Sequence, residues 1–260
     1  MIGAIAGDII GSRFEAQPIK RSDFDFFHPQ CRFTDDTVLT VAVADAILRG
    51  IGYAESLQTW GRKYPSAGYG GTFYRWIWQK DPQPYNSWGN GSAMRVSPVG
   101  FAFDAAEQVL AHAERSAAVS HNHPEGIKGA QAVALVIFLA SSGHTKTQIR
   151  STLKQCFGYD LNRTVAQIRP CYAFDVSCQG SVPEAIIAFL ESTDLLTAIG
   201  NAVSLGGDSD TQACIAGAIA EAFYGEVPRA LRAFVRDKIP DDMWRVVTDF
   251  YRRYLPWAGL

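Results

Sequence analysis

Two short acidic motifs stand before apolar runs, and their side chains could bind divalent metal ions. The first reads TDDT over residues 34–37 and precedes VLTVAVADAIL; the second reads GGDSDT over residues 206–211 and precedes QACIAGAIAEAFYG. Each motif also suits a helix start, because a hydroxyl or carboxylate caps free backbone N–H groups and early acids stabilise the helix dipole. The candidate metal ligands are Thr34, Asp35, Asp36, Asp208, Asp210 and Thr211.

The repetition of the pattern favours the metal-site interpretation over capping alone. Four carboxylates brought together from two helix starts would repel one another and raise one another's pKa values unless cations neutralised them. All the candidate ligands are oxygens, so Mg²⁺ or Mn²⁺ suits the site better than Zn²⁺ or Cu²⁺. A carboxylate-bridged pair of ions would use this many acids. The glycines at 206 and 207 permit close backbone approach before Asp208.

A further acid, Asp8, lies within the apolar sequence GAIAGDIIG, which we expect to be helical. A buried carboxylate needs a partner, because an unpaired buried charge is costly. Asp8 therefore either pairs with an arginine or supports the acidic site from behind. Glu15 follows two helical turns later, so helical geometry would place it on the same face as Asp8.

Two polar segments could contact a substrate. The sequence SWGNGSAMR over residues 87–95 is a Gly/Asn/Ser loop before a helix, and its backbone N–H groups could hold a pyrophosphate, although the same sequence also suits an ordinary turn. In SHNHPE, residues 120–125, two histidines are too few for a metal site of their own. His121 is instead a candidate helix cap or hydrogen-bond donor to substrate.

The spacing of apolar residues predicts an all-α fold. Three- and four-residue spacing predicts helices over residues 35–49, 104–118, 125–141, 183–191, 194–204, 211–224 and 241–255, and sustained alternation is nearly absent. Thr34, Thr193 and Asp208 are plausible N-caps, and Gly50, Gly143 and Gly225 are plausible stops. One long irregular stretch, residues 66–98, is rich in Gly, Asn, Ser, Pro and aromatic residues. A loop of that length is more often functional than idle.

Length and composition indicate one domain over residues 1–260. The formal net charge is −2, with no basic stripe of the kind that binds nucleic acid, and we find no signal peptide and no apolar run long enough for a membrane span. The five cysteines are scattered and odd in number, which favours reduced, buried thiols and a cytoplasmic location over a disulfide framework.

The sequence resembles the ADP-ribosylglycohydrolase family, founded by the dinitrogenase reductase-activating glycohydrolase. The motifs that carry the resemblance occur in the family's order and extend to about Gly225: GDIIGSRFE (7–15), FTDDTV (33–38), GNGSAMRVSP (89–98), SHNHPEGIKGA (120–130) and SLGGDSDTQACIAGAIAEAFYG (204–225). The resemblance implies an all-α domain around a dinuclear Mg²⁺ or Mn²⁺ site, and hydrolysis of the N- or O-glycosidic bond that links ADP-ribose to an arginine, a serine or a small acceptor.

The resemblance also implies roles for individual residues. Thr34, Asp35 and Asp36 match the first ligand group, and Asp208, Asp210 and Thr211 match the second. Glu15 matches an acid near the scissile ribose, and Asp35, Asp36 or Glu15 are the candidate catalytic carboxylates. Substrate binding would fall to His121 and to the loop of Ser87, Trp88, Gly89, Asn90 and Gly91.

Two other functions are compatible with these motifs. A crystallin-like relative could keep the fold and bind ADP-ribose without hydrolysing it, although the intact acidic motifs argue against this. A different two-metal hydrolase could act on phosphoesters. The sequence leaves the acceptor open: ADP-ribose linked to a nucleic-acid end is a further possibility despite the lack of a nucleic-acid-binding signal.

Overall fold

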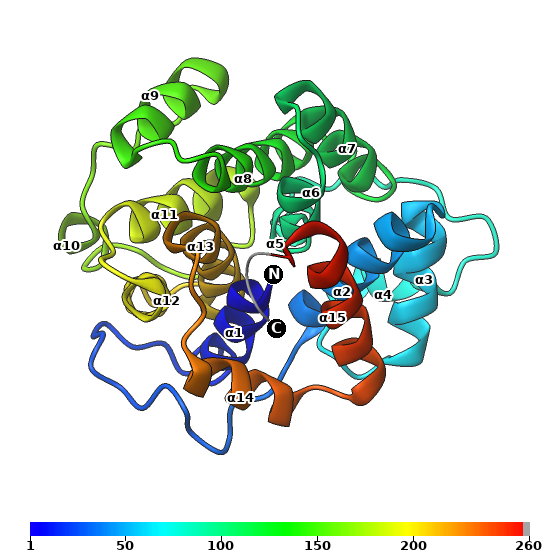
Figure 1. Cartoon of the computed structure of the whole chain (residues 1–260), viewed down its shortest axis with the longest axis horizontal. Coiled ribbons are helices and arrows are strands. Elements are labelled where there is room, and N and C mark those ends of the chain that lie inside the picture. The colour runs from blue at the N-terminus through cyan, green and yellow to red at the C-terminus, as the bar shows by residue number, and fades with distance from the viewer. Residues whose placement is uncertain (257–260) are drawn as a thin grey trace.

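The computed structural model describes residues 1–256 and confirms the all-α prediction (Figure 1). Within these residues there is no strand, and a single isolated bridge joins Gly89 to Ser177. The last four residues of the domain predicted over 1–260 lie outside the described part. The helices are α1 (Ile2–Gly11), α2 (Asp35–Arg49), α3 (Tyr53–Lys63), α4 (Gly71–Ile77), α5 (Gly91–Met94), α6 (Ser97–Ala102), α7 (Ala106–Ala118), α8 (Pro124–Ser141), α9 (Lys146–Phe157), α10 (Val165–Ile168), α11 (Cys178–Leu190), α12 (Leu195–Val203), α13 (Ser209–Tyr224), α14 (Arg229–Lys238) and α15 (Asp241–Tyr254).

Helices α1 and α13 form the centre of the molecule and pack against each other more extensively than any other pair (Figure 1). Every residue of α1 is buried. Small residues allow the two backbones to touch: a Cβ added at Gly3 would lie 2.2 Å from the Gly217 carbonyl oxygen, and one at Gly7 would lie 2.0 Å from that of Ala213. This close approach carries Asp8 on α1 to the N-terminal end of α13, where the second acidic motif lies.

We expect Gly7→Ala to destabilise the fold by about 3 kcal/mol or more, since the new methyl group would meet rigid backbone and force the central helices apart. The matched control is Gly52→Ala, where an added Cβ meets nothing within 4 Å. Urea unfolding followed by circular dichroism measures both. Equal midpoints for the two variants would contradict the packing described for α1 and α13.

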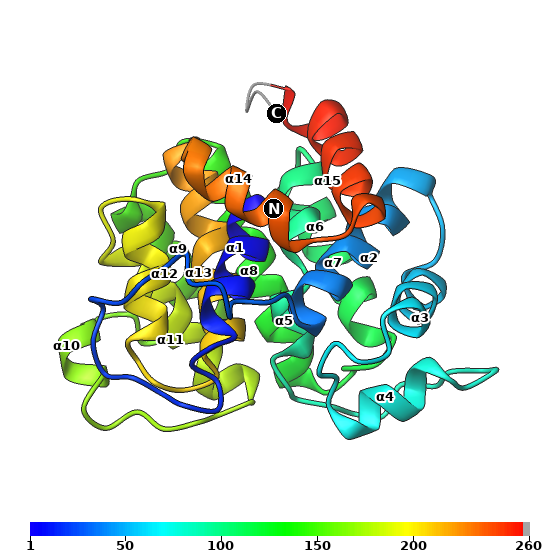
Figure 2. The ribbon, with the colours of Figure 1, turned by 90° about the horizontal axis from the view of Figure 1, so that it is seen from below.

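The remaining helices cover the central pair from two sides (Figures 1 and 2). Helices α8, α11 and α12 pack against α13, whereas α2 is packed by α3, α6 and α15 on the other side. Helix α2 also contacts α1. The first acidic motif, at the start of α2, is thereby directed toward the same region as the second, at the start of α13.

The predicted helices all occur, and several of the predicted boundaries hold. Thr34 is the N-cap of α2, its Oγ1 accepting from the N–H of Asp36, and Gly50 and Gly225 end α2 and α13 in the left-handed conformation. Gly143 also follows the end of α8 at Ser141 as predicted, with a φ of +81° and its N–H donating to the Ala140 carbonyl. Other predicted boundaries were wrong: Asp194, not Thr193, caps α12, and α11 begins at Cys178, not at residue 183, and contains Pro183.

The loops differ from the prediction more than the helix boundaries do. The stretch 66–98 is not wholly irregular, because α4, α5 and the first two residues of α6 lie within it. The segment from residue 12 to residue 34 contains no helix, so it is a second long loop that the sequence did not single out. Helices α3, α9 and α14 were also missed; they are amphipathic and carry many charged side chains on their outer faces.

Candidate metal centre and substrate cleft

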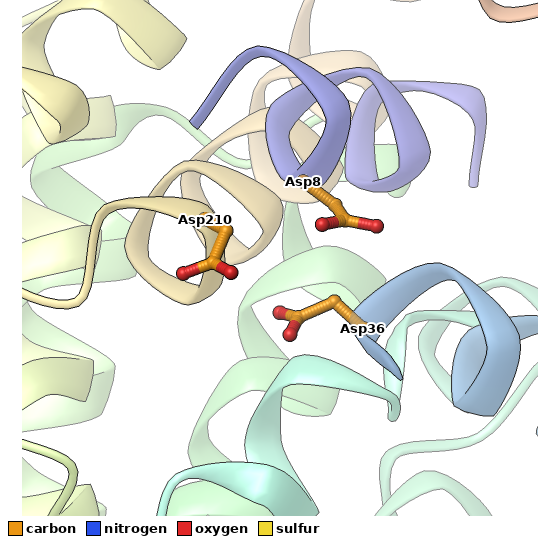
Figure 3. Close-up of side chains that lie close together, drawn as sticks. All are labelled: Asp8, Asp36 and Asp210. Atoms are coloured by element: carbon orange, nitrogen blue, oxygen red, sulfur yellow. The ribbon is translucent and has the colours of Figure 1, made fainter. Parts of the chain in front are cut away.

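Three carboxylates from three different helices meet at the centre of the structure. Asp8 of α1, Asp36 of α2 and Asp210 of α13 each place one carboxylate oxygen within 4.8 Å of the other two (Figure 3). All three side chains are buried. Burial is the main cause of a raised pKa in each, and the negative charge of neighbouring carboxylates adds to it for Asp36 and Asp210.

Asp8 is held by the first acidic motif rather than by an arginine. Its Oδ1 accepts from Thr34 Oγ1 at 2.6 Å, and its Oδ2 accepts from the Thr34 N–H at 2.9 Å and the Thr37 N–H at 3.0 Å. The Thr37 hydroxyl also donates to Oδ2. Burial still raises the pKa of Asp8 to about 6. Of the two roles expected for Asp8, pairing with an arginine is therefore wrong. The carboxylate instead accepts hydrogen bonds from Thr34 and Thr37 and so holds the first turn of α2 in place.

The donor set and its hydrogen bonding fit a hard divalent cation. Asp36 Oδ2 accepts from Thr211 Oγ1 at 3.4 Å, but Asp36 Oδ1 has no hydrogen-bond partner among the described residues although it is buried. A buried carboxylate oxygen without a partner is strongly destabilising unless a cation or proton compensates its charge. The cluster offers only oxygen atoms, which are the ligands that Mg²⁺ and Mn²⁺ prefer.

The second acidic motif adds a further group of acids beside this cluster. Glu15, Asp208 and Asp210 place carboxylate oxygens within 4.8 Å of one another. Asp208 occupies the N-cap position of α13 but makes no side-chain capping bond; its Oδ2 accepts instead from Asn90 Nδ2 at 2.7 Å. Asp210 therefore belongs to both groups of acids.

Two glycines before Asp208 allow the backbone to turn and to pass close to its neighbours, as the sequence indicated. Gly206 adopts a φ of +67°, a conformation that other residues rarely take. A Cβ added at Gly207 would lie 2.3 Å from Tyr172 Cε1. This turn lets the chain pass tightly under the loop that carries Tyr172 before α13 begins.

Asp35 and Glu15 lie at the edge of the acidic centre and face open space. Burial, reinforced by the charge of Asp8, raises the pKa of Asp35 to about 8. Desolvation and the nearby Asp208 raise the pKa of Glu15, while Arg32 acts in the opposite direction. Glu15 does not share a helical face with Asp8 as predicted, because α1 ends at Gly11 and the chain then turns. It reaches the acids from the loop.

A cleft of about 550 Å³ opens above the acids, and most of the predicted site residues line it. Its floor includes Asp35, Asp36, Asp208, Asp210 and Thr211, and one wall is the loop from Ser87 to Gly91. Two backbone hydrogen bonds hold that loop: Asn90 N–H donates to the Val176 carbonyl at 2.7 Å, and Cys178 N–H donates to the Trp88 carbonyl at 2.9 Å. Thr34 is not among the lining residues; it contacts Asp8 behind them.

His121 lies against the same loop, with its Nε2 close to Gly91: a Cβ added there would be 3.1 Å from Nε2. Its Nδ1 is hydrogen-bonded to Ser120 Oγ at 2.8 Å, and Ser120 Oγ accepts from Arg95 Nη2 at 2.9 Å. Burial, with the charge of Arg95, holds the pKa of His121 well below its usual value, so the ring is neutral at pH 7. His121 is not a helix cap; His123 caps α8 instead.

Some lining residues had no recognisable signal in the sequence. Phe174 and Val176 lie in the loop before α11 and are 55% and 50% exposed, and Trp88, next to the Gly89–Ser177 bridge, is 53% exposed in the same cleft. Large apolar side chains left this accessible at a cleft suit an aromatic or sugar ring better than they suit water. Tyr85 and Phe73 line the same cleft.

An all-α fold with buried acids beneath a cleft, and with a glycine-rich loop beside it, is a hydrolase-like arrangement. The family model described as ADP-ribosylglycohydrolase matches residues 1–258, and the chain belongs to this family. The enzyme class expected from the sequence, an ADP-ribosylglycohydrolase, is thereby confirmed.

Several curated proteins and a solved structure are similar to the chain. ADP-ribosylhydrolase ARH3 of Xenopus tropicalis is 24% identical, covering 99% of this chain and 92% of its own length. The human ADP-ribosylhydrolase ARH3 is 26% identical, with 88% and 86% covered. A structure titled "ADP-ribosylglycohydrolase-related protein complex" aligns with a TM-score of 0.72 at 22% identity, covering 98% of this chain and 97% of that one, which shows the shared fold.

Two further expectations concern the cysteines and membranes. All five cysteines are free, but only Cys31, Cys178 and Cys214 are buried, whereas Cys156 and Cys171 are exposed. The expectation of buried thiols was therefore wrong for two of them.

Within residues 1–256 no helix combines the length and apolarity needed to cross a bilayer. The cytoplasmic location stays a prediction.

Proposed function

We propose that this chain, as one domain over residues 1–260, hydrolyses the bond between ADP-ribose and a modified side chain or small acceptor, with two Mg²⁺ or Mn²⁺ ions as cofactors. The observation that carries the proposal is the unpartnered, buried oxygen of Asp36 among the acids at the floor of a cleft with a glycine-rich wall. The acids supply a cation site, and the wall supplies a site for a diphosphate.

The ligand roles follow the two acidic motifs. Asp36 and Asp210 would hold the ions directly. Asp8 joins them because of its place in the cluster. The other ligands expected from the sequence are Asp35, Asp208, Thr34 and Thr211. When bound, divalent ions would orient ribose hydroxyls and make a water molecule a better nucleophile at neutral pH.

The cleft wall would bind the rest of ADP-ribose. Ser87, Gly89, Asn90 and Gly91 present backbone and small polar groups to the cleft, where a diphosphate fits without steric hindrance from side chains. Because Ser120 Oγ accepts from Arg95, its own proton is available to His121 Nδ1, which would leave the Nε2 proton directed at the substrate. Trp88 and Phe174 offer apolar surfaces for a ring.

Asp35 and Glu15 are the candidate groups for proton transfer. Cleavage at the anomeric carbon passes through an oxocarbenium-like state, and water supplies the hydroxyl to that carbon and a proton to the departing acceptor. A carboxyl with a raised pKa is suited to give or take this proton near neutral pH. Both residues border the cleft and both pKa values are raised.

A panel of arginine-, serine- and nucleic-acid-linked ADP-ribose substrates, assayed with Mg²⁺, Mn²⁺ and chelator, tests the proposal. We expect free ADP-ribose to be released from at least one substrate with either metal and not in chelator. Binding of ADP-ribose without release from any substrate would support a non-catalytic role. Release of phosphate from nucleotides alone would support a phosphoesterase.

A further inference from the structure

An arginine in the cleft wall makes only some of the hydrogen bonds that its guanidinium could make. Arg95 is completely buried, and it is the only arginine or lysine among the described residues that lines the cleft. Its Nη2 donates to the Ser116 carbonyl and to Ser120 Oγ, both at 2.9 Å. Its Nε and Nη1 have no hydrogen-bond partner within residues 1–256. Buried N–H groups without an acceptor are costly, so their presence at a cleft calls for a functional explanation.

The charge of Arg95 also lacks a direct counter-ion. No carboxylate in the described part of the chain forms an ion pair with it, and its guanidinium carbon lies instead 5.6 Å from the centroid of the Phe73 ring. Burial lowers the pKa of Arg95 to about 10, and the charge of Asp35 opposes this shift, so the side chain is cationic at pH 7. A buried cation without an ion-pair partner lowers stability unless a bound anion compensates its charge.

Arg95 also determines which nitrogen of His121 carries a proton. Among the described residues, the buried hydroxyl of Ser120 has two hydrogen-bond partners, Arg95 Nη2 and His121 Nδ1. A guanidinium can only donate, so the hydroxyl proton has Nδ1 as its one acceptor. The neutral ring of His121 must then carry its own proton on Nε2.

The Nε2 of His121 is directed at the glycine-rich loop, where no side chain covers it. A Cβ added at Gly91 would lie 3.1 Å from Nε2, and one at Gly89 would lie 3.6 Å from it. Both glycines line the cleft. Their lack of side chains therefore leaves the Nε2 proton open to an oxygen atom of a ligand.

We propose that Arg95 is a positioning residue of the diphosphate site: its buried charge favours the diphosphate, and its bond to Ser120 keeps His121 an Nε2–H donor to a phosphate oxygen. This inference rests on the proposed function, because it needs the diphosphate of ADP-ribose in the cleft. It depends neither on the acceptor nor on the hydrolytic step. Arg95 acts through its charge and through Ser120, not by donating to the ligand itself.

Calorimetric titration with ADP-ribose and with adenosine, in Mg²⁺, tests the inference. The two ligands share a base and a ribose, but only ADP-ribose carries the diphosphate. We expect Ser120→Ala to raise the Kd of ADP-ribose about five- to tenfold and Arg95→Met to raise it about thirtyfold or more, with the Kd of adenosine changed less than about twofold. Ser56→Ala is the matched control: it removes a buried hydroxyl on α3 that donates to the Ala42 carbonyl, and it should change neither Kd.

A merely structural role for Arg95 gives a different result. Distortion of the cleft would weaken the binding of ADP-ribose and adenosine by the same factor, and that outcome would overturn the inference. Circular dichroism checks that each variant is folded. If Arg95→Met does not fold, Ser120→Ala decides alone, because it keeps the arginine: an unchanged ratio of the two Kd values in that variant would overturn the inference as well.

Nuclear magnetic resonance of the protein with isotope-labelled histidine measures the tautomer directly. The chain has five histidines, and the spectrum of His121→Gln identifies the signals of His121. We expect a protonated Nε2 and an unprotonated Nδ1 in the wild type. In Ser120→Ala we expect the proton to be shared between the two nitrogens, because Nδ1 has lost its fixed donor. A protonated Nδ1 in the wild type would contradict the role given to Arg95.

Failure of this inference is distinguishable from failure of the proposed function. If the wild type binds ADP-ribose but hydrolyses no ADP-ribosylated substrate, the proposed hydrolysis is wrong, and the ratio of the Kd values still decides the role of Arg95. If hydrolysis occurs and the ratio is the same in Ser120→Ala and wild type, the hydrolase stands and the role of Arg95 is wrong. A wild type that neither binds ADP-ribose nor releases it would overturn both.

Discussion

We expect Asp210→Asn to reduce ADP-ribose release by about a thousandfold at saturating substrate, since under the proposed function it removes a metal ligand and so forfeits several kcal/mol of transition-state stabilisation. Asp210 is the residue that both groups of acids share, and it lies beside the unpartnered oxygen of Asp36. The amide has nearly the same shape as the carboxylate but carries no charge, so the change acts on cation binding more than on packing.

The measurement pairs steady-state release of ADP-ribose with calorimetric titration of Mg²⁺ and Mn²⁺. Asp249→Asn is the matched control, because the Asp249 side chain is 47% exposed on α15 and pairs with Arg252. We expect the control to keep wild-type activity and metal affinity. Retention of more than a tenth of the wild-type rate by Asp210→Asn, with unchanged metal binding, would remove Asp210 from the metal site.

Signals within the sequence were enough to predict the helices that carry the acids. The caps and stops of α2 and α13 depend on short-range chemistry: the Thr34 hydroxyl at one end and the left-handed Gly50 and Gly225 at the others. The acidic motifs could be located for the same reason, because each lies at the start of a predictable helix.

The sequence could not specify features that depend on contacts between distant segments. Asp8 joins Asp36 and Asp210 only because glycines let α1 pack backbone to backbone on α13, and a glycine's partner cannot be read from spacing alone. A second cavity beside the acids likewise brings together Arg32, in the loop before α2, and Lys63, the last residue of α3. Glu15 was placed on a helix that ends four residues earlier, because nothing in the local pattern requires α1 to stop at Gly11.

The metal-free protein should lose stability as pH rises from about 4 to 8, and added Mg²⁺ should restore it most at the upper end. The cause is the raised pKa of the buried acids, about 6 for Asp8 and about 8 for Asp35, with Asp36 and Asp210 also raised. In the unfolded chain these groups titrate near pH 4. Between the two values the folded state binds more protons than the unfolded state, so the free energy of unfolding falls with pH.

The effect of Mg²⁺ has the opposite dependence on pH, because the carboxylates must lose their protons to bind it. At a hundred times its Kd, a ligand adds about 2.7 kcal/mol to the free energy of unfolding. For a chain of this size that corresponds to a rise in Tm of about 5 to 10 °C. We therefore expect a large Mg²⁺-induced rise at pH 8 and a small one at pH 5, measured by thermal denaturation after dialysis against chelator.

The double variant Asp36→Asn, Asp210→Asn separates this linkage from general effects of salt and pH. It removes two buried acids with raised pKa values, so its Tm should vary less with pH and should not respond to Mg²⁺, whereas Asp249→Asn should behave as the wild type. A Mg²⁺-induced rise of equal size at pH 5 and pH 8 would mean that the cation binds elsewhere. Because the readout is Tm, the result holds whichever acceptor the enzyme uses, and it tests the metal site independently of catalysis.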